Sequence, residues 1–269
     1  MFKLIENRGA CFFQSTLLRS THGFSTRIGG FSVLEHTRGL NIAYGHGDGE
    51  ETVKKNVCAL ADAVGVEASA IISVPQVHSA TVRLVDADDA GSGVFKETKF
   101  ECDGYVSTLC GLPIGVKTAD CVPILLEARS DEGEVLAVSA VHAGWRGTAS
   151  RIVRNAVEML CSLGAKRQNI YVAIGACIDE CCYEVGEDFA CQIREKLGQS
   201  YENRFIKNRE TGSIYADLKG MNLAILSECG IPRENIDVSE GCTCCQPDLY
   251  YSHRRQRGVR GAMMSLICK

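Results

Sequence analysis

The stretch from Thr118 to Thr148 constrains the fold more than any other part of the chain. Two apolar runs, Val122–Leu126 and Val135–Val141, flank a polar segment centred on Asp131 and Glu132. Apolar runs of strand length on both sides of a short polar segment are typical of a β-hairpin. The sequence therefore predicts two neighbouring antiparallel strands here.

This hairpin brings together Cys121, which opens the first strand, and His142, which closes the second. With the turn centred on Asp131 and Glu132, Cys121 pairs directly opposite His142. Directly opposed residues share one face of the sheet, with Cβ atoms about 4.5–5.5 Å apart. A two-residue shift of the pairing would keep the shared face, whereas a one-residue shift would not. A thiolate and an imidazole so placed can hold one metal ion or form a nucleophile–base pair.

His78 is a further candidate beside this pair. It lies in the short connection PQVHSA, between strands expected at Ile71–Val74 and Thr81–Val85. We expect it to compete for a third ligand position next to Cys121 and His142.

The segment after the hairpin predicts an anion site. The turn HAGWRGT leads into a helix that Thr148 or Ser150 caps and that runs to about Leu163. Exposed N–H groups at a helix N-terminus attract anions, and Arg146 adds a guanidinium. The alternative for Arg146 is a structural salt bridge. Asp120 is expected on the opposite face from the thiol, in a structural role.

Residues 22–49 are rich in glycine and polar residues, with only short apolar pieces. Such a long irregular segment in a compact domain is usually functional or disordered. It carries Arg27, Arg38, Asn41 and His46, and arginine forks suit planar or tetrahedral anions. The segment therefore predicts an anion- or sugar-binding loop, and a solvated loop is the alternative.

The remaining periodicity predicts an α+β fold. With 269 residues and 45% hydrophobic residues, the chain has enough core for one large domain, and it shows no internal repeat and no GxGxxG pattern. We expect a single domain over residues 1–269, with helices packed on antiparallel or mixed sheets. The expected helices are Thr52–Val64, Glu187–Leu197 and Leu218–Cys229, and the further strands are Asp103–Ser107, Ile114–Lys117, Ile170–Ile174, Ile236–Val238 and Ala262–Ile267.

The termini and the charge bear on location and partners. The N-terminal MFKLIENRGACFF has no signal-peptide core, and no apolar run reaches the roughly 18–20 residues of a membrane span. We therefore expect a cytoplasmic protein that does not contact a membrane, as a monomer or a homodimer. The net charge of -4 argues against nucleic-acid binding and leaves small anionic ligands open.

The fifteen cysteines are expected to be reduced thiols. Cys242 and Cys245 form a CxxC, but a zinc ribbon needs two separated CxxC pairs and this is the only one. The sequence therefore does not predict a second metal site. The cysteines expected in the core are Cys58, Cys110, Cys161 and Cys229, and the spacing outliers are Cys177, Cys181, Cys182, Cys242, Cys244 and Cys245.

Six segments, in order, give the chain a family resemblance: PQVHSATV, CDGYVS, TADCVPILL, VHAGWRGT, GACIDECCYEVGEDF and YYSHRRQ. Together they resemble the YfiH family, whose members carry the names polyphenol oxidase, laccase-domain protein and purine nucleoside phosphorylase. The resemblance covers nearly the whole chain. It implies a layered α+β sandwich related to the catalytic domain of cytotoxic necrotizing factor. It also implies that His78, Cys121 and His142 bind zinc.

The resemblance implies a zinc-dependent purine nucleoside phosphorylase that acts on adenosine, inosine, guanosine and S-methyl-5'-thioadenosine, with adenosine deaminase activity. Two histidines and a cysteine with an open fourth position form a catalytic type of zinc site. Phosphorolysis also needs an anion pocket beside the metal. Arg27, Arg38, His46 and Arg146 are the candidates for phosphate or ribose contacts, and Asn41 for a ribose hydroxyl.

Three other functions stay open. Cys121 and His142 suit a thiol hydrolase, including the cell-wall precursor editing role proposed for bacterial relatives. Copper outcompetes zinc for such ligands, which would allow incidental copper-dependent phenol oxidation. A true laccase framework is not expected, because the chain has six histidines and no HxH pair. The last is a non-catalytic metal-binding or partner protein.

Overall fold

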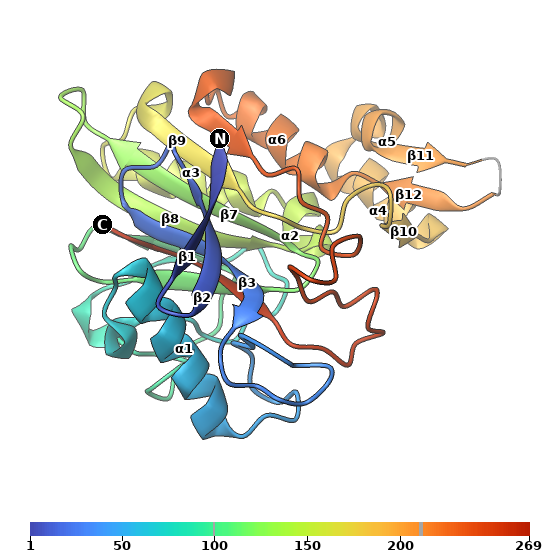
Figure 1. Cartoon of the computed structure of the whole chain (residues 1–269). Coiled ribbons are helices and arrows are strands. Elements are labelled where there is room, and N and C mark those ends of the chain that lie inside the picture. The colour runs from blue at the N-terminus through green and yellow to red at the C-terminus, as the bar shows by residue number, and fades with distance from the viewer. Residues whose placement is uncertain (99, 210–211) are drawn as a thin grey trace.

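Two β-sheets packed face to face form the centre of the structure, and helices cover both outer faces (Figure 1). This computed structural model describes residues 1–98, 100–209 and 212–269. Both parallel and antiparallel pairs occur in the larger sheet. The predicted α+β layered sandwich with mixed sheets is therefore confirmed.

The larger sheet has the strand order β13-β9-β7-β8-β5-β4. The predicted hairpin, β7 and β8, lies at its centre. Ile124 and Leu126 of β7 pack toward helices α3 and α6, whereas Leu125 packs toward the second sheet, as alternation along a strand requires. The elements are β4 (Val82–Leu84), β5 (Gly104–Ser107), β7 (Val122–Arg129), β8 (Val135–Ala143), β9 (Ile170–Ile174), β13 (Ile236–Val238), α3 (Ile152–Ser162) and α6 (Leu218–Glu228).

The second sheet has the order β1-β2-β3-β14-β6, so its last strand in sequence lies between two earlier ones. Helix α1 covers its outer face with the predicted stripe that includes Val57 and Leu60. Gly65, in the left-handed conformation at φ 91°, ends this helix. The elements are β1 (Phe2–Asn7), β2 (Ala10–Ser15), β3 (Thr21–Gly29), β6 (Ile114–Thr118), β14 (Met263–Cys268) and α1 (Glu50–Val64).

A small sheet with the order β10-β12-β11 extends from one end of the molecule together with α4 and α5 (Figure 1). Helix α4 has the predicted bounds, whereas the other elements of this part were not predicted. They are β10 (Glu184–Val185), α4 (Glu187–Leu197), α5 (Gln199–Phe205), β11 (Ile206–Asn208) and β12 (Ile214–Ala216). Short 3-10 helices occur at Ala68–Ala70, Ala87–Asp89, Arg167–Asn169 and Arg233–Asn235.

Several local predictions are wrong. Residues 22–49 begin as strand β3 and become irregular only after Gly29. The expected strand Ile71–Val74 is reduced to a single bridge at Ile72. The helix after the hairpin is divided in two: α2 (Trp145–Ala149) ends before Arg151, whose left-handed φ of 60° breaks the helix before α3 begins.

Two cysteines expected in the core are exposed, Cys58 and Cys110. Cys58 follows the buried Val57 by one position, which places it about 100° around α1 from the apolar stripe. Cys110 lies in the turn between β5 and β6. Among the described residues, no helix combines the length and the apolar character needed to cross a lipid bilayer.

Candidate metal centre and its pocket

The register of the β7–β8 hairpin differs from the predicted one by two residues. Pro123, rather than Cys121, lies opposite His142. The turn at residues 130–134 closes around Gly133, whose φ of 87° is easily adopted by glycine, so the turn centre lies further along the chain than predicted. A shift of two residues keeps the faces of both strands, and Cys121 and His142 still meet.

His78, Cys121 and His142 come together as predicted, with one ligand atom from each lying within 4.8 Å of the others. The Cys121 Sγ lies 3.8 Å from the His78 Nε2, and the two imidazole rings are 4.9 Å apart between centroids. His142 is buried, whereas His78 is exposed, so the group is open on one side. Two imidazoles and a thiol with one open side match the donor set of a catalytic zinc site.

Gly144 leaves the space that these side chains occupy. A Cβ at this position would lie 2.7 Å from the His78 Cδ2 and 3.3 Å from the Cys121 Sγ. The backbone therefore passes so close to the metal-binding group that a larger residue would displace it.

Asp103 holds both histidines in place. Its Oδ1 accepts hydrogen bonds from the His142 Nδ1 at 2.8 Å and from the backbone N–H of His78 at 3.0 Å. Its Oδ2 accepts from the backbone N–H and the hydroxyl of Ser79. A carboxylate on Nδ1 directs the Nε2 of the ring toward a metal. The backbone bonds also hold His78 in a left-handed conformation with φ 59°.

Burial acts to raise the pKa of Asp103, but hydrogen bonds from His142 and Ser79 lower this pKa to about 2. The carboxylate is therefore ionised at neutral pH. Sequence reasoning did not single out Asp103, and the one signal for it was its position in the quoted segment CDGYVS.

In the absence of a metal ion, Cys121 and His142 stabilise each other's charge. Burial disfavours the charged form of both, but the charge and hydrogen bond of His142, followed by those of His78, lower the pKa of Cys121 to about 6. Against burial, Cys121 and Asp103 raise the pKa of His142 to about 9. A metal ion must therefore displace a proton from His142 in order to bind.

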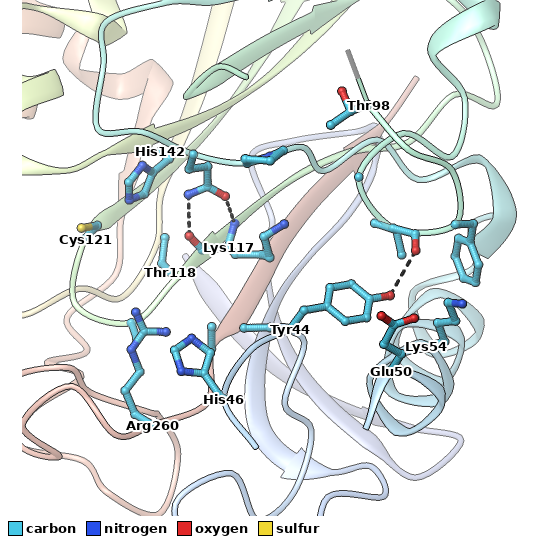
Figure 2. Close-up of a pocket in the computed structure, with 18 of the residues that line it drawn as sticks. Tyr44, His46, Glu50, Lys54, Thr98, Lys117, Thr118, Cys121, His142 and Arg260 are labelled. Atoms are coloured by element: carbon cyan, nitrogen blue, oxygen red, sulfur yellow. Dashed lines mark hydrogen bonds between the residues drawn. The ribbon is translucent and has the colours of Figure 1, made fainter. Parts of the chain in front are cut away.

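The three residues open into a pocket of about 740 Å³ (Figure 2). Its size falls within the range of small-molecule sites. In Figure 2, Cys121 and His142 lie at one end, and Tyr44 lies further along toward Glu50 and Lys54. The basic and imidazole side chains that line it, besides the metal-binding group, are His46, Lys54, Lys96, Lys117 and Arg260.

Arg260 is the basic residue best placed to bind an anion. Its guanidinium and the His46 ring lie next to each other, at the end of the pocket near Cys121 (Figure 2). The Arg260 Nη1 donates to the carbonyl of Gly261, whereas the buried Nε has no hydrogen-bond partner among the described residues. A buried N–H of a cation with no acceptor is a costly arrangement that a bound anion relieves.

His46 lies at this end of the pocket, and Lys117 also lines the pocket. Burial, followed by the charge of Arg260, lowers the pKa of His46, so its ring is neutral at pH 7. Burial lowers the pKa of Lys117 to about 8, and its Nζ donates to the carbonyl of Ser73. Sequence reasoning identified His46 and missed Arg260 and Lys117, which lie in no motif that signals an anion site.

The arginines predicted for the anion site lie elsewhere. Arg27 donates to the carbonyls of Pro247 and Arg38, and its guanidinium lies 4.7 Å from the centroid of the Tyr251 ring. Arg146 is exposed and stacks on Trp145 at 4.4 Å. Arg27, Arg38 and Arg146 are all absent from the lining of the pocket.

Asn41 is fully buried, and its amide holds the loop together. Its Nδ2 donates to the Ala43 carbonyl and to the Asp48 carboxylate, and its Oδ1 accepts the backbone N–H groups of Ala43 and Ala262. The side chain that sequence analysis assigned to a ribose hydroxyl is thus fully used within the protein.

Asp120 has the predicted structural role. Its carboxylate accepts the hydroxyl of Thr243 and the backbone N–H of Arg254, both at 2.6 Å. These bonds hold Asp120 at a left-handed φ of 94°, directly before Cys121. The C-terminal loop therefore fixes the backbone that presents the thiol.

Comparison with known proteins places the chain in a family. Residues 21–269 match the family model described as "Multi-copper polyphenol oxidoreductase laccase". A protein named adenosine deaminase RL5, from an unknown prokaryotic organism, is 33% identical over 240 residues, which cover 88% of this chain and 90% of that protein. A purine nucleoside phosphorylase of Deinococcus radiodurans is 35% identical over 247 residues, covering 91% and 88%.

Two solved structures share the whole fold. YlmD from Geobacillus stearothermophilus superposes with a TM-score of 0.89 at 31% identity, over 100% of this chain and 98% of that one. The hypothetical protein YfiH from Bacillus licheniformis gives the same TM-score of 0.89 at 31% identity, over 99% and 98%. On this sequence and structural evidence, the chain belongs to the laccase-like YfiH family.

Proposed function

We propose that the protein is a zinc-dependent purine nucleoside phosphorylase that also deaminates adenosine. The observation that carries the proposal is a cationic pocket end directly beside the group His78, Cys121 and His142. Within the part of the chain that the structure describes, the Arg260 Nε at this end has no hydrogen-bond partner. Relatives named purine nucleoside phosphorylase and adenosine deaminase support it. The proposed substrates are adenosine, inosine, guanosine and S-methyl-5'-thioadenosine.

The residues of the pocket end fit zinc. The three donors are the ring nitrogens of His78 and His142 and the sulfur of Cys121, whose thiol has a lowered pKa. Asp103 orients the His142 ring toward the ion. Bound zinc supplies a Lewis acid at this end of the pocket. Copper would compete for the same ligands, and zinc is proposed because the group is mononuclear and has no histidine-rich framework around it.

In phosphorolysis, a phosphate oxygen attacks C1' of the ribose while the bond from C1' to the purine nitrogen breaks and its electrons pass to the base. Arg260 would hold the phosphate through charge-assisted hydrogen bonds, and Lys117, which also lines the pocket, would add positive charge. The ring of Tyr44, held by a bond from its hydroxyl to the Val94 carbonyl, offers an apolar wall for the purine. The contribution of the chain to this reaction is thus to position the phosphate and the purine and to stabilise the negative charge of the phosphate.

Product analysis by mass spectrometry tests the proposal. Zinc-loaded protein is given adenosine with and without phosphate. We expect adenine and ribose 1-phosphate only with phosphate, inosine without phosphate, and inosine or its phosphorolysis product hypoxanthine with phosphate. Adenosine that returns unchanged from both samples would refute the nucleoside function.

A second candidate is a thiol hydrolase, favoured by the arrangement of Cys121, His142 and Asp103 as nucleophile, base and orienting carboxylate. A thiolate held by zinc is a poor nucleophile, so this activity requires the metal-free protein. Hydrolysis of an activated ester by chelator-treated protein, lost in Cys121→Ala and suppressed by zinc, would favour the hydrolase over the phosphorylase.

A further inference from the structure

A second group of sulfur donors lies outside the lining of the pocket. We propose that Cys181, Cys182, Cys242 and Cys245 bind one zinc ion as a closed site of four thiolates. One Sγ from each residue lies within 4.8 Å of the others. This proposal does not depend on the function proposed above, because it concerns different residues.

The fold brings the two cysteine-bearing loops together. Strands β9 and β13 run parallel, with Val238 paired to Ile174, and both loops leave the ends of these strands on the same side. The pairing continues into the loops through an isolated parallel bridge between Cys177 and Cys242, and the N–H of Thr243 donates to the Cys177 carbonyl. The sulfur atoms thus meet because two neighbouring strands extend side by side.

The distances between the sulfur atoms fit a tetrahedron around one ion. The Cys181 Sγ lies 3.6 Å from that of Cys182, 3.7 Å from that of Cys242 and 3.5 Å from that of Cys245. The Sγ atoms of Cys182 and Cys245 are 3.3 Å apart. Zinc–sulfur bonds of about 2.3 Å place tetrahedral ligands roughly 3.8 Å apart. A disulfide would require about 2.05 Å, and all four are free thiols.

Three guanidinium groups lie against the same loops. Arg254 donates to the carbonyls of Cys182 and Glu184, and Arg209 donates to the carbonyl of Cys181. Arg255 donates to the carbonyls of Thr243 and Cys244. A divalent ion with four thiolates carries a net negative charge, and the nearby cations offset it.

Exposure separates this group from ordinary core cysteines. Cys181 and Cys245 are exposed, Cys182 is half-buried and Cys242 is buried, so burial in a hydrophobic interior does not account for the group as a whole. With four protein donors and no open position, the site is of the structural type.

Zinc content per chain tests the site. Reduced protein is loaded with zinc, desalted, and measured by elemental mass spectrometry. We expect two zinc ions in the wild type, one in Cys242→Ser, one in Cys121→Ala, and two in Cys58→Ser, the matched control for an exposed cysteine elsewhere. One zinc in the wild type that Cys121→Ala removes and Cys242→Ser retains would overturn the four-thiolate site and support the pocket site. One zinc in the wild type that Cys242→Ser removes and Cys121→Ala retains would support this site and refute the pocket site.

X-ray absorption at the zinc edge of Cys121→Ala gives a second test in a protein with all four thiols intact. We expect a shell of sulfur alone at about 2.3 Å. A shell containing nitrogen or oxygen would contradict the proposal, as would an intact-mass deficit showing disulfides among the four cysteines. Cys245→Ser, changed at an exposed position, replaces Cys242→Ser if circular dichroism shows that the latter does not fold.

Discussion

The two groups of metal-binding side chains in this molecule differ in donor number and in access. His78, Cys121 and His142 offer two nitrogens and one sulfur and open into a pocket of about 740 Å³. The four cysteines of the second group offer sulfur alone and leave no open position. One fold can therefore hold a group suited to chemistry and a group suited to structure, and a free coordination position distinguishes the first from the second.

The two groups are connected through the backbone. Thr243 lies between the cysteines of the CxxC, is fully buried, and donates its hydroxyl to Asp120, directly before Cys121. The loop that carries Cys242 and Cys245 therefore helps to hold Asp120, and with it the backbone of Cys121, in place. If the two groups differ in this way, loss of the pocket group should reduce activity and loss of the four-thiol group should reduce stability.

The largest effect is expected from Cys121→Ala. Removal of a ligand should abolish nucleoside turnover, exceeding the roughly 10–100-fold cost of losing an outer partner of a metal ligand. The melting temperature should change little, because the remaining core is intact. Steady-state kinetics and calorimetry measure the two quantities, with Cys58→Ser as control. Stoichiometric zinc retained at the pocket site would contradict the ligand assignment.

Cys242→Ser should show the reverse pattern. Loss of a structural metal should lower the free energy of unfolding by about 3 kcal/mol and the melting temperature by about 6–12 °C. Turnover at 25 °C should fall far less than in Cys121→Ala. Calorimetry of zinc-loaded samples provides the measurement, and an unchanged melting temperature would show that the four cysteines do not stabilise the fold.

Asp103→Asn should weaken the pocket site without removing a ligand. The amide cannot accept all the N–H groups that the carboxylate accepts, and loss of an outer partner lowers metal affinity by roughly 10–100-fold. Competition with a chelator measures the affinity. Asp131→Asn, at an exposed carboxylate paired with Lys166, is the control. Equal affinity in Asp103→Asn and wild type would show that Asp103 does not orient the ligands.

Arg260→Ala should raise the KM for phosphate about tenfold, because a hydrogen bond to a charged group contributes about 1.5 kcal/mol. Arg154→Ala, at an exposed arginine of α3, is the control and should leave the KM unchanged. A larger effect from Arg146→Ala than from Arg260→Ala would favour the anion site that the sequence predicted and move phosphate away from the pocket end.

The smallest effect concerns pH. The Lys117 amine is charged below its pKa of about 8 and neutral above it. The KM for phosphate should therefore rise a few-fold as the pH increases from 7 to 9, beyond any change in Lys117→Met. Initial rates at varied phosphate and pH test this, and identical pH profiles in the two proteins would exclude Lys117 from phosphate binding.

Much of the scaffold could be predicted from periodicity, since helix α4 and strands β9 and β13 have the expected bounds. The register of the hairpin could not be predicted. It depends on the left-handed backbone conformation of Gly133, and the sequence does not show that the turn closes at this residue. The pocket triad was found because its residues lie in distinctive segments. A second metal site was not predicted because the sequence holds one CxxC and not two, and spacing does not reveal the β9–β13 pairing that brings the two cysteine-bearing loops together. Arg260 was missed because it lies in no motif that signals an anion site.

The position of β14 has a consequence for how the protein is made. This strand comes from residues 263–268 and lies between β3 and β6, which are synthesised much earlier. At ribosomal rates, on the order of ten seconds or more separates β6 from β14. During that time both neighbours present unpaired edges, which can bind another chain. The sheet is therefore completed after translation of the last strand, and a nascent chain stalled before residue 263 lacks the strand that joins β3 to β6.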